Sequence, residues 1–201
     1  MNNISFKEKV AYAEQQLQNG ANPRFVFSQV WKFSDGFATV RLEDKYNFIN
    51  TNGKIISDLW FDEAWDFEEG FAVVQLYDRG WNFIKPDGNI LRDDLWFDSV
   101  GEFHEGLAVV YLKGRGCNFI DAGGSILRKD IWFDWVEDFK EGFAEVKLKG
   151  KPYYIDNIGK LYDQDKNLIE NRRRTVRLTE SQLRNTIKNV VAQCLNKGRR
   201  R

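Results

Sequence analysis

Residues 59–90 read LWFDEAWDFEEGFAVVQLYDRGWNFIKPDGNI, and nearly the same pattern returns at residues 95–126 as LWFDSVGEFHEGLAVVYLKGRGCNFIDAGGSI. The glycine of the Glu-Gly-Phe-Ala string recurs at intervals of 34, 36 and 36 residues, as Gly36, Gly70, Gly106 and Gly142. Self-similarity at a fixed period of this length is typical of repeat proteins, whose units bury their apolar faces against their neighbours. The sequence therefore predicts four tandem repeats over residues 25–162.

The runs inside each repeat, such as residues 72–76 and 81–84, are short and rich in β-branched and aromatic residues, which favours strands. Three pairs are predicted to be two-residue hairpin turns with both residues at positive φ; they are Asn52-Gly53, Asp87-Gly88 and Gly123-Gly124. We expect a mainly β fold in which β-meander or hairpin repeats of ~36 residues stack as an array. A propeller-like arrangement is the alternative.

Helices are predicted at both ends of the chain. Ser5 and Glu8 form a capping box that predicts an N-terminal capping helix within residues 1–20. A second capping box predicts a basic amphipathic helix and tail over residues 178–201. Residues 163–177 are polar and basic and are predicted to be a linker.

The tail combines positive charge with an apolar face. Residues 172–201 hold ten Lys or Arg against one acid, whereas residues 1–171 hold 20 basic against 29 acidic residues. Such asymmetry predicts an acidic body with a basic interaction tail. The arginines of interest are Arg172, Arg173, Arg174, Arg199, Arg200 and Arg201, and the apolar face carries Leu183, Ile187, Val191 and Leu195. The arginines suit a polyanion, whereas the apolar face needs the array, a second copy of the helix or another protein.

Sequence motifs of enzymes are missing. There is no Gly-Lys-Ser/Thr phosphate loop, no Gly-x-Ser-x-Gly and no His-Glu-x-x-His. One histidine and two distant cysteines, Cys117 and Cys194, do not suggest a metal site or a disulfide. We therefore expect no enzyme, no catalytic residue, no metal and no cofactor.

Two reactive side chains, His104 and Cys117, can be judged by the residues at the equivalent position (slot) of the other repeats. His104 shares its slot with Ser34, Glu68 and Lys140, which predicts an exposed histidine without a function. Cys117 is placed in the slot of Tyr46, Trp81 and Tyr153, which predicts a small core residue.

The N-terminus lacks the apolar run of a signal peptide, and no stretch is long and apolar enough for a membrane span. We expect an intracellular protein without a membrane partner.

Polar residues recur at fixed places in the repeats. The acids before the repeat glycines could form a cation-binding ladder or could be turn residues in water; they are Asp35, Glu69, Glu105 and Glu141. Two further series are predicted to bond the backbone near turns; they are Asp62, Asp98 and Asp134, and Asn47, Asn82 and Asn118.

Three tryptophans occupy slots that vary between repeats. Trp31 and Trp65 align with Gly101 and Glu137, and Trp135 aligns with Gln29, Glu63 and Ser99. A slot that accepts glycine or glutamate is expected to face outward, so we consider these rings candidates for binding a partner. The alternative is an edge tryptophan packed under the next repeat.

The period, the Glu-Gly-Phe-Ala strings and the aromatic-Asn-Phe-Ile strings resemble the bacterial WG-repeat family over roughly residues 25–162. The resemblance implies a β-rich repeat array with an interaction role, and it supplies no catalytic residues. The tail string VRLTESQLRNTIKNVVAQCL resembles a C-terminal segment of proteins from gut Bacteroidales and their phages. The two resemblances imply a bacterial cytoplasmic protein, or one of the virion or host cytoplasm if a phage encodes it.

The leading hypothesis is a non-catalytic protein-interaction module or scaffold with a docking or targeting tail. The alternatives are association with nucleic acid through the basic tail and carbohydrate binding through exposed tryptophans.

The tail sequence predicts that apolar contacts dominate its specific binding. Changing both Ile187 and Val191 to Ser should abolish capture of the tail's partner at about 200 mM salt, whereas changing Arg199, Arg200 and Arg201 to Gln should mainly slow association. The measurement is partner capture across a salt series. The opposite result would identify the tail as a polyanion-binding arm.

Overall fold

The computed structural model describes residues 4–169. The chain divides into two compact units, Met1–Leu168 and Ile169–Arg201. The predicted tail helix, its arginines and Cys194 lie outside the described residues. The predicted start of the linker at residue 163 lies inside the first unit, where Leu168 still pairs with Tyr162.

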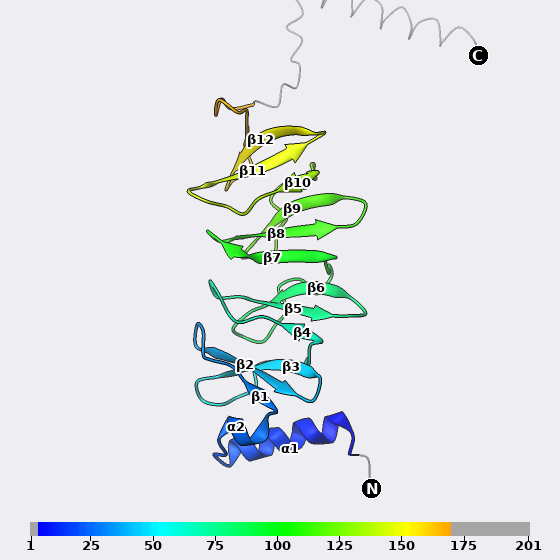
Figure 1. The fold of residues 1–201 in the computed structure, drawn as a ribbon, viewed down its shortest axis with the longest axis vertical. Helices are drawn as coiled ribbons and strands as arrows, with labels where there is room; N and C mark the ends of the chain where they lie inside the picture. Colours follow the sequence, from blue (N-terminus) through cyan, green and yellow to red (C-terminus); the bar gives the residue numbers. More distant parts are fainter. Residues whose placement is uncertain (1–3, 170–201) are drawn as a thin grey trace, which may run out of the picture. The chain divides into compact units, whose positions relative to one another are not determined.

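Four small antiparallel sheets follow one another in chain order within the first unit (Figure 1). The first repeat forms β1 (Gln29–Val30), β2 (Phe37–Leu42) and β3 (Lys45–Asn50), and the second forms β4 (Glu63–Ala64), β5 (Ala72–Leu76) and β6 (Gly80–Ile84). The third forms β7 (Ser99–His104), β8 (Leu107–Leu112) and β9 (Gly116–Asp121), and the fourth forms β10 (Trp135–Val136), β11 (Phe143–Leu148), β12 (Lys151–Asp156) and β13 (Leu161–Tyr162). The predicted stack of meanders is confirmed, and the layers do not close into a propeller.

The N-terminal helix covers the first repeat. Helix α1 (Phe6–Gln18) begins with the predicted capping box, in which the Glu8 amide donates to Ser5 Oγ at 3.3 Å and the Ser5 amide donates to Glu8 Oε2 at 2.8 Å. Its one fully buried residue, Ala13, packs in a cluster with Ala38 and Val40 of β2. A short helix that was not predicted, α2 (Pro23–Val26), follows, with the Asn22 side chain as its N-cap. No helix within residues 4–169 is long and apolar enough to cross a membrane.

Three hydrophobic clusters are shared between consecutive repeats, and a fourth joins the N-terminal helices to the first repeat. Phe67 of the second repeat stacks on Phe37 at 4.4 Å between ring centroids and meets Phe48 edge-on at 5.0 Å, both in the first repeat. Phe103 and Phe139 occupy the same place one and two repeats later and are also buried. Burying a phenylalanine stabilises a fold by about 1.5–3 kcal/mol. These rings therefore hold neighbouring repeats together.

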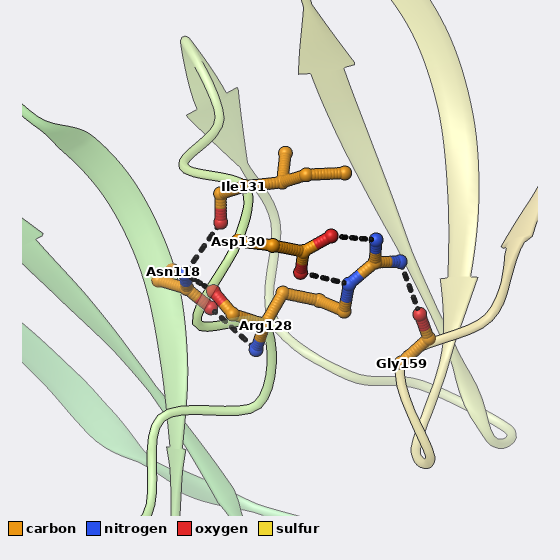
Figure 2. A network of polar contacts seen from close by, with 5 residues as sticks. All are labelled: Asn118, Arg128, Asp130, Ile131 and Gly159. Atoms are coloured by element: carbon orange, nitrogen blue, oxygen red, sulfur yellow. Dashed lines mark hydrogen bonds and ion pairs between the residues drawn. The ribbon is translucent and has the colours of Figure 1, made fainter. Parts of the chain in front are cut away.

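A buried asparagine organises the segment that links one sheet to the next. Asn118 is fully buried, and its Nδ2 donates to the carbonyls of Arg128 at 2.8 Å and Ile131 at 2.9 Å (Figure 2). Its Oδ1 accepts from the Phe119 amide. The equivalent residues Asn47 and Asn82 are also fully buried and make the same pattern of bonds. Since buried carbonyls need donors, one amide fixes the path of each linking segment.

The same segment reaches the next repeat through an arginine. Arg128 Nε and Nη2 donate to the two carboxylate oxygens of Asp130, each at 2.9 Å, and Nη1 donates to the Gly159 carbonyl at 2.7 Å (Figure 2). Arg92 makes the equivalent bonds to Asp94 and Gly124. The paired carboxylate holds the guanidinium in place against the neighbouring turn.

The predicted two-residue turns were wrong. Of each predicted pair only the glycine has positive φ, as in Gly53 at +76°, and its amide donates to Asn50 three residues earlier. The glycine therefore ends a four-residue turn. Two consecutive residues have positive φ instead at the acid–glycine pairs, such as Glu69 at +48° and Gly70 at +81°, and at Lys149-Gly150.

The predicted alignment of the fourth repeat was wrong by one residue. Val146 pairs with Tyr153 where Val110 pairs with Asn118, so Tyr153 occupies the asparagine slot. Pro152, and not Tyr153, corresponds to Cys117. The hairpin loop at residues 149–150 is one residue shorter than the loop at 113–115, which shifts the strand that follows.

Replacing Asn82 by Ala should destabilise the protein by about 2–4 kcal/mol, because two carbonyls of the linking segment lose their donor in the interior. Asn157 is an exposed turn residue, and its replacement by Ala should cost less than about 0.5 kcal/mol. Urea unfolding of both variants measures the difference. Equal losses would remove the structural role assigned to the buried amide.

Candidate partner-binding grooves

A groove opens between the first and second repeats, beside the short strands β1 and β4. We name it groove 1–2. Four aromatic residues and four acids line it together with Arg41; they are Trp31, Tyr46, Trp65 and Tyr77, and Asp44, Asp62, Glu63 and Asp66. The two repeats contribute to both groups, so the groove exists only because the sheets stack.

Two of the predicted tryptophans, Trp31 and Trp65, line this groove, and each packs against a different ring. Trp31 leans on Tyr46 with 5.9 Å between ring centroids, and Trp65 meets Trp81 at 5.8 Å. Trp65 is 40% exposed and Tyr77 is 71% exposed, whereas Trp31 is half-buried. The predicted outward orientation therefore holds for Trp65.

The third predicted tryptophan lies apart from this groove. Trp135 on β10 is 39% exposed, and Lys147 Nζ lies 5.1 Å from its ring centroid. The structure thus brings together Trp31 and Trp65 but not Trp135.

The carboxylates of groove 1–2 differ in the hydrogen bonds that they accept from the rest of the protein. Burial tends to raise the pKa of Asp62, but hydrogen bonds from Lys45 and from the Tyr77 amide outweigh it and lower that pKa below its usual value. Asp66 Oδ1 accepts from Thr39 Oγ1 at 2.6 Å. Asp44 and Glu63 lie exposed at the rim. The groove therefore presents carboxylates beside open aromatic faces, which suits a cationic ligand group.

A second groove, groove 3–4, lies at the equivalent place between the third and fourth repeats. Val109, Tyr111 and Val136 line it where groove 1–2 has Thr39, Arg41 and Ala64. The two tryptophan slots hold Gly101 and Glu137. Its walls are consequently poorer in rings than those of groove 1–2.

A comparison with protein families identifies the repeats. A family model described as WG containing repeat matches residues 24–46, 48–79 and 133–151. The array is built from WG-containing repeats. Strands β7–β9, outside these matches, have the same pairing as the strands of the matched repeats, so the third unit has the same local fold.

Several solved structures align with part of the chain, with TM-scores of 0.40 or lower. The computationally designed Ika8 protein is 16% identical over 71% of this chain and 48% of its own, with a TM-score of 0.40. The designed Ika4 protein is 15% identical over 65% of this chain and 90% of its own, with a TM-score of 0.40. A protein of unknown function from Bacteroides caccae is 12% identical over 70% and 58%, with a TM-score of 0.30. The chain thus spans about half of the first of these structures. No curated protein matches the chain.

The turn acids of the WG repeats tie each turn to the next. Asp35 Oδ2 accepts from the Gly70 amide at 3.1 Å, and Glu69 Oε2 accepts from the Gly106 amide at 3.3 Å. Glu105 accepts from the amides of Glu141 at 2.7 Å and of Gly142 at 2.8 Å. These acids are therefore inter-repeat acceptors, a role that neither sequence hypothesis included. Within residues 4–169 no group of side chains has the arrangement of a metal site.

The other polar series bond the backbone, as predicted. Asp62, Asp98 and Asp134 accept from turn amides of the following hairpin at 2.8, 2.6 and 2.7 Å. The asparagines bond the linking segments and not the adjacent turns, and they are more deeply buried than expected.

His104 and Cys117 have surroundings that do not activate their side chains. The His104 side chain is 40% exposed, and its Nε2 lies 3.9 Å from Asp138 Oδ2 of the next repeat. Cys117 is half-buried, and burial raises the pKa of its thiol. A raised pKa disfavours the thiolate, which agrees with a packing role.

Replacing Glu105 by Ala should destabilise the array by about 1 kcal/mol, because two amides of the next turn lose a charged acceptor at an exposed site. Glu141 has the same turn position and the same φ of +54°, and none of the described amides donates to its side chain. Glu141→Ala is thus the matched control and should cost less. Denaturant titration compares them, and identical midpoints would contradict the inter-repeat role.

Proposed function

We propose that this WG-repeat protein is a non-catalytic interaction module whose groove 1–2 binds a basic segment of another protein. The observation that supports the proposal is the clustering of exposed rings and carboxylates in one groove. Trp65 and Tyr77 offer open faces, and Asp44 and Glu63 stand at the rim. Lysine and arginine are attracted both to aromatic faces and to carboxylates.

The stacked fold favours such binding energetically. Phe67, the Thr39–Asp66 bond and the bond from Ser34 Oγ to the Phe67 carbonyl at 2.7 Å all connect the two repeats that form the groove. A groove held by such contacts loses little conformational freedom when a partner binds. The excess of acidic over basic residues in residues 1–171 adds long-range attraction for a basic partner.

The non-catalytic part of the proposal is supported by how the repeated polar residues are used. The asparagine series, the Trp-Phe-Asp aspartates and three of the four turn acids, Asp35, Glu69 and Glu105, are engaged in backbone hydrogen bonds. Side chains engaged in this way serve the fold and are not free for proton transfer.

The tail remains a separate proposal based on sequence. Its apolar face suits docking on a protein partner or self-assembly, and its arginines suit nucleic acid. The exposed Trp65 favours carbohydrate as a second ligand class for the groove itself. Asp62 is paired with Lys45, but the other three carboxylates in the lining make a cationic peptide the better match.

Site-specific photo-crosslinking tests the proposal. A photoreactive phenylalanine analogue placed at Tyr77 keeps a ring at the groove, and the same analogue at the exposed Asn157 is the control. Irradiation in the cell of origin should give a discrete adduct from position 77 that an excess of lysine- and arginine-rich peptide suppresses. An adduct that soluble polysaccharide suppresses instead, or equal labelling from position 157, would contradict the proposal.

A further inference from the structure

Groove 3–4 lacks a pair of aromatic rings that is present in groove 1–2. In the first repeat Trp31 leans on Tyr46, and in the second Trp65 leans on Trp81. Strand register places Gly101 and Cys117 at these two positions in the third repeat. Both members of the pair are therefore small in the same repeat.

A hollow lies beside Gly101, and Cys117 is not part of its lining. Groove 3–4 has a volume of about 710 Å³, compared with about 540 Å³ for groove 1–2, and its lining includes His104 and Phe139. The equivalent residues of groove 1–2, Ser34 and Phe67, are not part of the lining there, where Trp31 is. The floor of the hollow is apolar, formed by Val109, Val136 and Phe139.

The register of β7 shifts between Val100 and Phe103, but the same offset in the first two repeats accommodates Trp31 and Trp65, so it does not explain a glycine at position 101. Its φ lies outside the left-handed region, and an added Cβ would meet Asp138 Oδ1 and the Val109 Cβ at 3.5 Å, which is ordinary contact. By contrast, a Cβ at Gly80 or Gly116 would lie 2.4 or 2.3 Å from a carbonyl oxygen. Gly101 is thus a glycine that the fold does not require, beside a space that a ring fills elsewhere.

We propose that groove 3–4 receives an aromatic side chain of a partner protein, in the place that Trp31 occupies in groove 1–2. The inference rests on the proposed interaction function but concerns a different groove. Glu137 favours a lysine or arginine next to the ring, whereas Asp138 already faces His104 Nε2 at 3.9 Å. The chain's own tail is not the occupant, because residues 163–201 contain no Phe, Tyr or Trp.

The test uses the full chain and a defined probe, acetyl-Ser-(5-fluoro-Trp)-Lys-amide, observed by fluorine NMR so that the protein's own tryptophans are silent. Every sample contains excess acetyl-Ser-Ala-Lys-amide, which occupies sites that bind the lysine alone. Gly101→Trp fills the hollow with the chain's own ring and should raise the dissociation constant of the probe at least about tenfold. Gly101→Ala, whose Cβ fits without a clash, should leave most of the binding intact.

A measurement on the unchanged protein guards against misfolding of the tryptophan variant. Nuclear Overhauser contacts should join the probe's indole protons to the methyl groups of Val109 and Val136. Absence of binding by the unchanged protein, contacts to other residues, or equal binding by the Gly101→Trp chain would overturn the proposal. Crosslinking from Tyr77 should be unaffected by Gly101→Trp, so failure of this proposal is distinguishable from failure of the function proposed for groove 1–2.

Discussion

A sheet of three short strands has two faces and can bury neither by itself. Every layer of this protein therefore depends on a neighbour, and Phe67 and Phe103 supply the contact by reaching back into the preceding layer. At the N-terminal end α1 takes the place of a neighbour. At the last layer the slots of Phe48 and Thr39 hold Tyr154 and Glu145, and Lys166 Nζ lies 5.2 and 5.7 Å from the centroids of the Phe143 and Tyr154 rings. The array thus ends in more polar residues.

Hydrogen bonds then fix how the layers sit on one another. Apolar contact is not directional, so rings alone would allow neighbouring sheets to slide. The buried asparagines set the path of the linking segments, Arg92 and Arg128 attach these segments to the next turn, and the turn acids connect the opposite strand ends. Layers held at both ends leave grooves of defined width beside β4 and β10. The proposed binding surfaces therefore form as a consequence of how the sheets stack.

The four copies within one chain separate structural from adaptable positions. Slots that hold the same residue type in several copies, such as those of Asn82 and Phe83, are fully buried. Slots that vary, such as those of Trp65 and Gly101, line the grooves. Variation there gives groove 1–2 four aromatic residues and leaves groove 3–4 with fewer rings and a larger volume, without disturbing the strand pairing. A repeat array can therefore carry different recognition surfaces on one scaffold.

The sequence by itself determined the number of repeats, the meander within each, the capping helix and the outward position of Trp65, because these depend on period, local propensity and capping residues close in the chain. It failed at the acid–glycine turns, since glutamate is uncommon at positive φ, and at the fourth repeat, where a one-residue loop deletion shifted the register. Only the tertiary structure decided that the turn acids accept amides 35–37 residues away. It alone placed Trp31 and Trp65 in one groove and left a hollow at Gly101. Those features depend on the offset between stacked sheets, which packing between layers sets and which no single repeat encodes.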